Sequence, residues 1–178
     1  MSYAAFKTKK CLGPTTGDEY DDSNPCVLDS NLVSSNTSAY DIAIPVDAGS
    51  GYNYSFEVVI RMEMTTVPNN KVVNLKIWLQ GPVLMADGNP ATGATILVGT
   101  SSSGITPTDS VSSVATTDMV ANYYSKDNAL SLGIDETDDQ MDAIGEKSEW
   151  LVIQARIDDG TPVGDILTLP LMWDYDES

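Results

Sequence analysis

The most constraining feature of the sequence is a regular alternation between residues 52 and 64. Apolar side chains occupy every second position: Tyr52, Tyr54, Phe56, Val58, Ile60, Met62 and Met64. Polar residues hold most of the positions between them: Asn53, Ser55, Glu57, Arg61 and Glu63. Successive side chains of a strand point to opposite faces, whereas an apolar helix stripe needs a period of 3.6 residues. The pattern therefore predicts one half-buried strand with an apolar face.

Further short apolar segments, separated by turn-forming residues, follow this run. They cover residues 71–79, 95–98, 130–134, 150–157 and 163–173, and no long helical pattern lies among them. Residues 67–70 predict a hairpin connection between the first two strands, and residues 100–118 a Ser/Thr-rich loop with one weak strand near 111–115. Closely spaced strands without long helices predict an all-β fold: an antiparallel β-sandwich of about eight strands, immunoglobulin-like or jelly-roll in kind.

The first 37 residues have a different character from the rest of the chain. Residues 13–25 are rich in Gly, Pro, Asp, Asn and Thr, which are turn and loop formers. Such a segment has too few apolar side chains to build a core of its own. We therefore expect an extended N-terminal arm over residues 1–37 and a β-sandwich domain over residues 38–178.

Charge and composition exclude several functions. The chain has 26 acidic and 9 basic residues, for a net charge of −17, and it contains no histidine. A strongly negative body repels nucleic acid and anionic membranes, so we expect neither as a partner. Without histidine, neither a Ser-His-Asp triad nor an imidazole metal site can form. No other catalytic signature is evident, no segment has the length and hydropathy of a membrane-spanning helix, and the first residues lack a secretory signal. We expect a non-enzymatic protein made in the cytoplasm.

The N-terminal end is the one basic part of this acidic chain. Residues 1–10 carry three lysines and no acid, so they contribute +3 and the remaining residues −20. Scattered apolar residues in the arm suit shallow pockets or strand addition at a sheet edge. We expect the arm to leave its own domain and dock on a neighbouring copy, with contact residues Tyr3, Phe6, Lys7, Lys9, Lys10, Leu12, Val27 and Leu28.

Two further features of the sequence each leave two interpretations open. Cys11 and Cys26 enclose a polar loop, and they are either a disulfide pair or two free thiols. The second feature is an acidic segment that supplies hard oxygen ligands but lacks the spacing of an EF-hand, so it is either a solvated loop or a weak calcium site. Its carboxylates are Asp135, Glu136, Asp138 and Asp139. Apart from calcium, no cofactor is expected.

Aromatic residues suggest an alternative function. Trp78, Trp150 and Trp173, with Tyr52, Tyr54, Tyr123 and Tyr124, could form a platform on which sugars stack, although core packing is the commoner role for aromatics on strands. The alternative hypothesis is a β-sandwich module that binds carbohydrate or a cell surface, assisted by calcium.

Two predicted strand segments carry a resemblance. Residues 74–78 (Asn-Leu-Lys-Ile-Trp) and 97–101 (Leu-Val-Gly-Thr-Ser) resemble strands of small β-sandwich virion proteins of tailed viruses, either head-decoration or tail-associated. The acidic balance is similar to that of salt-adapted proteins, as in viruses of halophilic archaea. The resemblance implies a structural component that self-associates and contacts other virion proteins. Its expected location is the virion, after assembly in the host cytoplasm.

The acidic composition predicts how stability depends on salt. Carboxylates crowded within a Debye length, about 10 Å at 0.1 M salt, repel one another, and added ions screen this repulsion. The melting temperature of the purified chain should therefore rise from low to high NaCl. A flat or falling series would contradict the salt-adapted character.

Overall fold

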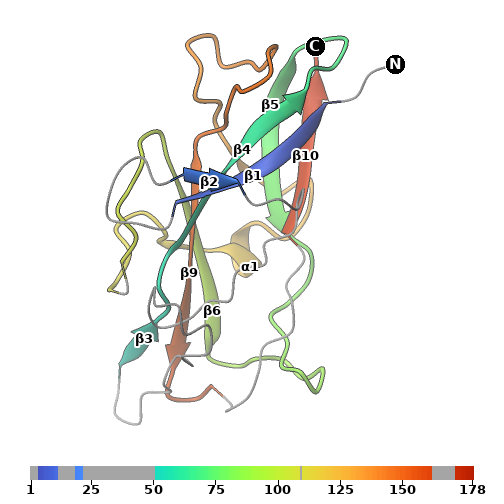
Figure 1. Cartoon of the computed structure of the whole chain (residues 1–178). Helices are drawn as coiled ribbons and strands as arrows, with labels where there is room; N and C mark the ends of the chain where they lie inside the picture. Colours follow the sequence, from blue (N-terminus) through green and yellow to red (C-terminus); the bar gives the residue numbers. More distant parts are fainter. Residues whose placement is uncertain (1–3, 12–18, 22–50, 109, 162–170) are drawn as a thin grey trace.

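The computed structural model describes residues 4–11, 19–21, 51–108, 110–161 and 171–178, and most of them lie in or between β-strands. One short helix, α1 (Met119–Asn122), follows β7, and Asp118 caps it by accepting a hydrogen bond from the backbone N–H of Ala121. The strands are β1 (Ala5–Cys11), β2 (Glu19–Asp21), β3 (Tyr52–Tyr54), β4 (Val58–Thr66), β5 (Val72–Leu79), β6 (Ala94–Ser101), β7 (Thr117–Asp118), β8 (Leu130–Ser131), β9 (Trp150–Asp158) and β10 (Leu171–Glu177) (Figure 1).

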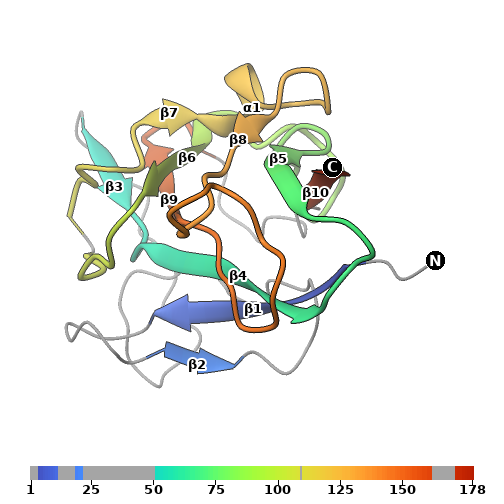
Figure 2. The same ribbon diagram turned by 90° about the horizontal axis from the view of Figure 1, so that it is seen from above.

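The strands form two antiparallel sheets, which confirms the predicted β-sandwich. The larger sheet has the order β2-β1-β4-β9-β6-β7, with β3 also beside β9, and the smaller has the order β10-β5-β8. Figure 2 shows β5 and β10 across the molecule from β6 and β9, with β4 and β1 along a third side. The order β1-β4-β9-β6, with β5 beside β10, corresponds to strands A-B-E-D and C-F of the immunoglobulin fold.

The connection between β4 and β5 differs from the prediction. Residues 67–70 were expected to join two paired strands, but β4 and β5 lie in different sheets. The same crossing occurs between β9 and β10, so β4 pairs with β9 in one sheet while β5 pairs with β10 in the other. Turn-forming residues show where the chain reverses, but they do not determine which sheet receives the next strand.

The main hydrophobic core fills the space between the sheets. Its fully buried members come from strands of both sheets and from the segments that connect them, and they include Ile60, Met64, Leu75, Ile77, Val98, Met119, Met141 and Leu151. Burial of such side chains contributes roughly 1.5–3 kcal/mol each relative to exposure. Partly buried aromatic residues at the rim, including Phe6, Trp173 and Tyr175, pack against this core.

The alternating run of residues 52–64 does not form one strand with a single apolar face. It divides into β3 and β4, which pair with β9 in registers that differ by one residue: Tyr54 lies opposite Arg156, but Val58 lies opposite Ile153. The extra residue reverses the faces, so Tyr54 packs on the outer face of the larger sheet, whereas Val58 belongs to the main core.

Ser55 explains why this irregularity is stable. Its hydroxyl accepts a hydrogen bond from the backbone N–H of Ala155 at 2.9 Å, while its own N–H donates to the Ala155 carbonyl at 2.9 Å. Glu57 then pairs outside the sheet, because its backbone N–H donates to the Thr108 carbonyl and its carboxylate accepts from the Thr108 N–H. Buried polar groups are thus satisfied although the regular ladder is interrupted.

Hydrogen bonds also join the two sheets along one side. The Leu132 N–H donates to the Leu75 carbonyl in the smaller sheet. Ile134 then forms a bridge with Ser148, and the Ser148 N–H donates to the Met62 carbonyl in β4. The segment that leads into β9 therefore lies against β4 and carries the hydrogen-bonded ladder from one sheet to the other.

The outer face of the larger sheet carries a second, smaller core. Val59, Leu97, Trp150 and Val152 are buried there together with Ala115, beneath the connection between β6 and β7. This connection passes so close to β6 that a Cβ at Gly99 would lie 2.0 Å from the Val114 carbonyl oxygen. The weak strand expected near residues 111–115 is not formed; side-chain contacts hold these residues instead.

Gln154 is the main polar attachment of that connection. It is fully buried, and its amide donates to the carbonyls of Ser55 (2.9 Å) and Ser110 (2.8 Å) while accepting from the Ser112 N–H (3.0 Å). The Ser112 hydroxyl accepts in turn from the N–H groups of Val114 and Ala115. One side chain of β9 therefore fastens both the β3–β4 irregularity and the outer connection.

Replacing Gln154 with leucine should destabilise the fold. The substitution leaves buried backbone groups at Ser55, Ser110 and Ser112 without their hydrogen bonds, so the free energy of unfolding should fall by about 3 kcal/mol. Urea denaturation followed by tryptophan fluorescence measures the change. Gln80→Leu, at an exposed position, is the matched control. Equal stability of the two variants would contradict the role assigned to Gln154.

Candidate functional site

Part of the segment predicted as an arm lies in the larger sheet of its own chain. β1 pairs along β4 from the Ala5–Thr66 pair to the Cys11–Val59 pair, and β2 pairs with the end of β1. We call β1 and β2 together the N-terminal hairpin. In the part of the chain that the structure describes, the hairpin is the outermost element of the sheet, on the far side of β4 from β9.

Two side chains of β1 attach the hairpin to the sandwich. Phe6 is half-buried against the main core, and its ring meets that of Tyr175 in β10 edge to face, with centroids 5.6 Å apart. Lys7 lies one residue further along, and its ammonium forms an ion pair with Glu63 of β4 at 2.8 Å. The attachment therefore combines an aromatic contact on the core side with a charge contact at β4.

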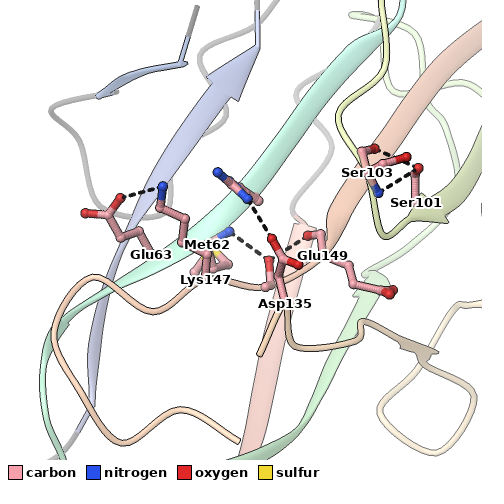
Figure 3. A network of polar contacts seen from close by, with 9 residues as sticks. Met62, Glu63, Ser101, Ser103, Asp135, Lys147 and Glu149 are labelled. Atoms are coloured by element: carbon pink, nitrogen blue, oxygen red, sulfur yellow. Dashed lines mark hydrogen bonds and ion pairs between the residues drawn. The ribbon is translucent and has the colours of Figure 1, made fainter. Parts of the chain in front are cut away.

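Two further charge contacts lie beside the Lys7–Glu63 pair, and they are made by Glu63 and Arg61 of β4. The second oxygen of Glu63 lies 3.9 Å from the Lys147 ammonium. Arg61, only 8% exposed, donates to Asp135 at 3.1 Å, and its guanidinium lies 4.3 Å from the centre of the Trp150 ring. Figure 3 shows Glu63, Lys147 and Asp135 gathered beside β4.

A buried serine holds the segment that supplies Lys147. The Ser148 hydroxyl accepts a hydrogen bond from the Met62 N–H at 2.9 Å and donates to the Glu149 carbonyl at 2.7 Å, and the Ser148 side chain is fully buried. Residues 147 and 148 are therefore fixed against the edge of β4 opposite the hairpin. We call Arg61, Glu63, Lys147 and Asp135, together with Lys7, the β4 charge row.

The predicted acidic residues face separate partners. Asp135 pairs with Arg61, Asp138 lies 3.8 Å from the Lys71 ammonium, and the Asp139 carboxylate accepts from the Ile134 N–H. Glu136 is exposed, and its carbonyl accepts from the Asp139 N–H. Across the described ranges, no three acidic, cysteine or histidine residues come together in a way that could hold a metal ion.

The other predicted contact residues of the arm, and the two cysteines of the possible disulfide, divide into two groups. Lys9, Lys10 and Cys11 lie in β1, where they are the register partners of Arg61, Ile60 and Val59 in β4. The positions that lie outside the described residues are Tyr3, Leu12, Cys26, Val27 and Leu28. The proposed Cys11–Cys26 pair therefore has only one member whose backbone is described.

The aromatic residues do not gather into one platform. Trp150 is 5% exposed and lies beneath Arg61, while Trp173 and Tyr123 pack against the main core. Tyr52 is exposed, and its ring stacks under the Arg156 guanidinium at 4.5 Å. Most of these rings thus have packing roles.

A separate ion pair fastens β10. Lys126 contacts the Asp174 carboxylate, and this hydrogen bond lowers the pKa of Asp174 below its ordinary value while raising the pKa of Lys126. A carboxyl with a lowered pKa stabilises the fold above its unfolded pKa, and this contribution is lost as the pH falls through the folded pKa. The stability that Asp174 contributes to the fold is therefore lost only at pH values below about 4.

Sequence patterning alone does not identify Glu63 and Tyr175, which contact the hairpin, or Arg61 beside Glu63 on β4. Glu63 and Arg61 occupied polar positions of an alternating strand and were assigned to its polar face, and Tyr175 was not singled out. The available signal was their charge: Arg61 and Glu63 alternate along one strand, a spacing that places both on one face.

Comparisons with protein-family models, with curated proteins and with solved structures found no match to this chain. A search of the described residues found no helix long and apolar enough to cross a membrane.

The Arg61 contact gives a prediction about stability. Arg61→Lys keeps the charge but removes the planar group that stacks on Trp150 and donates to Asp135. The free energy of unfolding should fall by about 1–2 kcal/mol, with a shift in tryptophan emission. Arg156→Lys is the control, because its ring partner Tyr52 is exposed. A larger loss in the control would contradict the role of Arg61.

Proposed function

We propose that the protein is a non-enzymatic structural component of a large assembly, a virion component of capsid-decoration or tail-associated type. Its copies self-associate through the N-terminal segment, and they also contact other virion proteins. The assembly forms in the host cytoplasm and involves neither nucleic acid nor membrane as a direct partner of this chain. The virion assignment rests on the resemblance of the strand segments.

One observation carries the proposal of self-association. The basic end of an otherwise acidic chain supplies β1 near the margin of the larger sheet, and β1 is attached through Phe6–Tyr175 and Lys7–Glu63. Edge strands are the parts of a sheet most readily shared with another chain. The three lysines of β1 and the acidic remainder of the chain attract each other, which favours their encounter at low salt.

The roles of other polar residues are consistent with a structural function. Gln154, Ser148 and Ser55 are fully buried, and their hydrogen bonds fasten backbone segments. Arg61 and Lys7 act as partners of carboxylates within the fold. These side chains position strands, and each is used for packing the sandwich.

The molar mass in solution tests self-association. Size-exclusion chromatography with light scattering, over a wide range of protein concentrations, should show oligomers, and Lys7→Glu should weaken them because it places two carboxylates together at Glu63. Glu63→Lys combined with Lys7→Glu restores an opposite-charge pair and should recover the oligomers. A monomer at every concentration would argue against self-association.

The virion assignment has its own test. Mass spectrometry of purified particles from cells that produce the protein should recover the chain in a constant ratio to the major capsid protein. Absence from the particles, together with retention on a glycan array, would instead favour a carbohydrate-binding module.

A further inference from the structure

One arginine of the larger sheet has no acidic partner. The chain contains two arginines, and Arg61 pairs with a carboxylate in the β4 charge row. Arg156 of β9 makes no ion pair with a carboxylate of the described residues, although 26 residues of the chain are acidic. Asp158, two residues further along β9, is used elsewhere, because its carboxylate accepts hydrogen bonds within the turn that follows the strand. The fold therefore supplies no counter-ion to the Arg156 guanidinium.

Two contacts orient the Arg156 side chain. Its guanidinium carbon lies 4.5 Å from the centre of the Tyr52 ring, and Nη2 donates to the Thr95 hydroxyl at 3.3 Å. These partners come from β3 and β6, the strands on the two sides of β9, where Tyr54 and Thr95 are the register partners of Arg156. Three strands thus hold the guanidinium in one place, and a group ordered in advance loses less entropy when a ligand binds.

These contacts leave hydrogen-bond donors of Arg156 unused. The Nε of Arg156 is buried and has no hydrogen-bond partner within the described parts of the chain. Buried donors are nearly always paired with protein, water or an ion, so an unpaired donor indicates a partner that the folded chain does not supply itself. A carboxylate is the group whose two oxygens match the planar fork of a guanidinium.

Tyr52 adds an apolar surface beside these donors. Its side chain is 52% exposed, although the guanidinium lies over its ring. A flat aromatic surface of this kind suits the C–H face of a sugar ring. β3, which carries Tyr52, lies at the end of the molecule away from the C-terminus, and so away from the Phe6–Tyr175 contact of the hairpin (Figure 1).

The charge of the whole chain limits which ligand fits here. A body with a net charge of −17 repels polyanions, and the repulsion grows with the number of charges on the ligand. A single carboxylate pairs with the one guanidinium and meets the least repulsion. A carboxylate carried on a sugar ring also uses the exposed ring of Tyr52.

We propose that Arg156 and Tyr52 form a binding site for a sugar that carries one carboxylate, such as a hexuronate. The carboxylate pairs with the guanidinium, and the sugar ring packs on the exposed part of the tyrosine ring. This site goes beyond the structural function proposed above, and it is independent of self-association through the N-terminal segment.

An NMR titration of the full chain tests the site. Because the chain contains two arginines, its spectrum has two arginine Nε–H signals, and Arg156→Lys identifies the one that belongs to Arg156. The probes are D-glucuronate, D-glucose as the neutral counterpart, and acetate as a carboxylate without a sugar ring, all at equal ionic strength. Glucuronate should shift the Arg156 signal until the site is saturated, glucose should leave it in place, and acetate should bind about fivefold more weakly than glucuronate.

Two tyrosine variants separate stacking from other effects. Tyr52→Ala and Tyr124→Ala remove side chains of nearly equal exposure, 52% and 53%, so both variants should fold. Tyr52→Ala should raise the dissociation constant of glucuronate about fivefold, whereas Tyr124→Ala should leave it unchanged. An Arg156 signal that glucuronate does not shift would overturn the site. Acetate that binds as tightly as glucuronate, or equal losses in the two tyrosine variants, would overturn its assignment to a sugar.

Discussion

The fold depends on hydrogen bonding along both edges of β4. One edge is covered by β1, and the other is covered by β9 and by the residues that lead into it, including Lys147 and Ser148. The inner face of β4 supplies Ile60 and Met64 to the main core. An unpaired buried backbone group destabilises the fold by as much as a lost hydrogen bond. Both neighbours of β4 are therefore needed to keep its backbone groups paired.

This arrangement explains why polar residues matter as much as apolar ones in a small sandwich. The interruption at Ser55 moves the tyrosines of β3 to the outer face while the strand continues inward at Val58. Gln154 then satisfies the backbone at that interruption and holds the connection that covers the outer core. A single buried amide thereby joins the β3–β4 interruption to the connection that covers the outer core.

The alternation of residues 58–64 and the apolar run at 150–157 made an all-β sandwich predictable. The reversal of faces at Ser55 was not predictable, because it depends on a hydrogen bond to Ala155, far away in the sequence. For the candidate site, charge and hydropathy single out Phe6 and Lys7. Their partners Tyr175 and Glu63 follow only from strand order, which local turn chemistry does not encode.

The separation of β4 from β9 along the chain bears on how the protein is synthesised. β1 and β2 leave the ribosome before β4, whereas Val58 must wait for Ile153, near the other end of the chain. Pairing between such distant strands slows folding, and nascent edges are exposed meanwhile. The hairpin is thus the partner available to β4 during translation, and it can shield that strand from premature aggregation until β9 arrives.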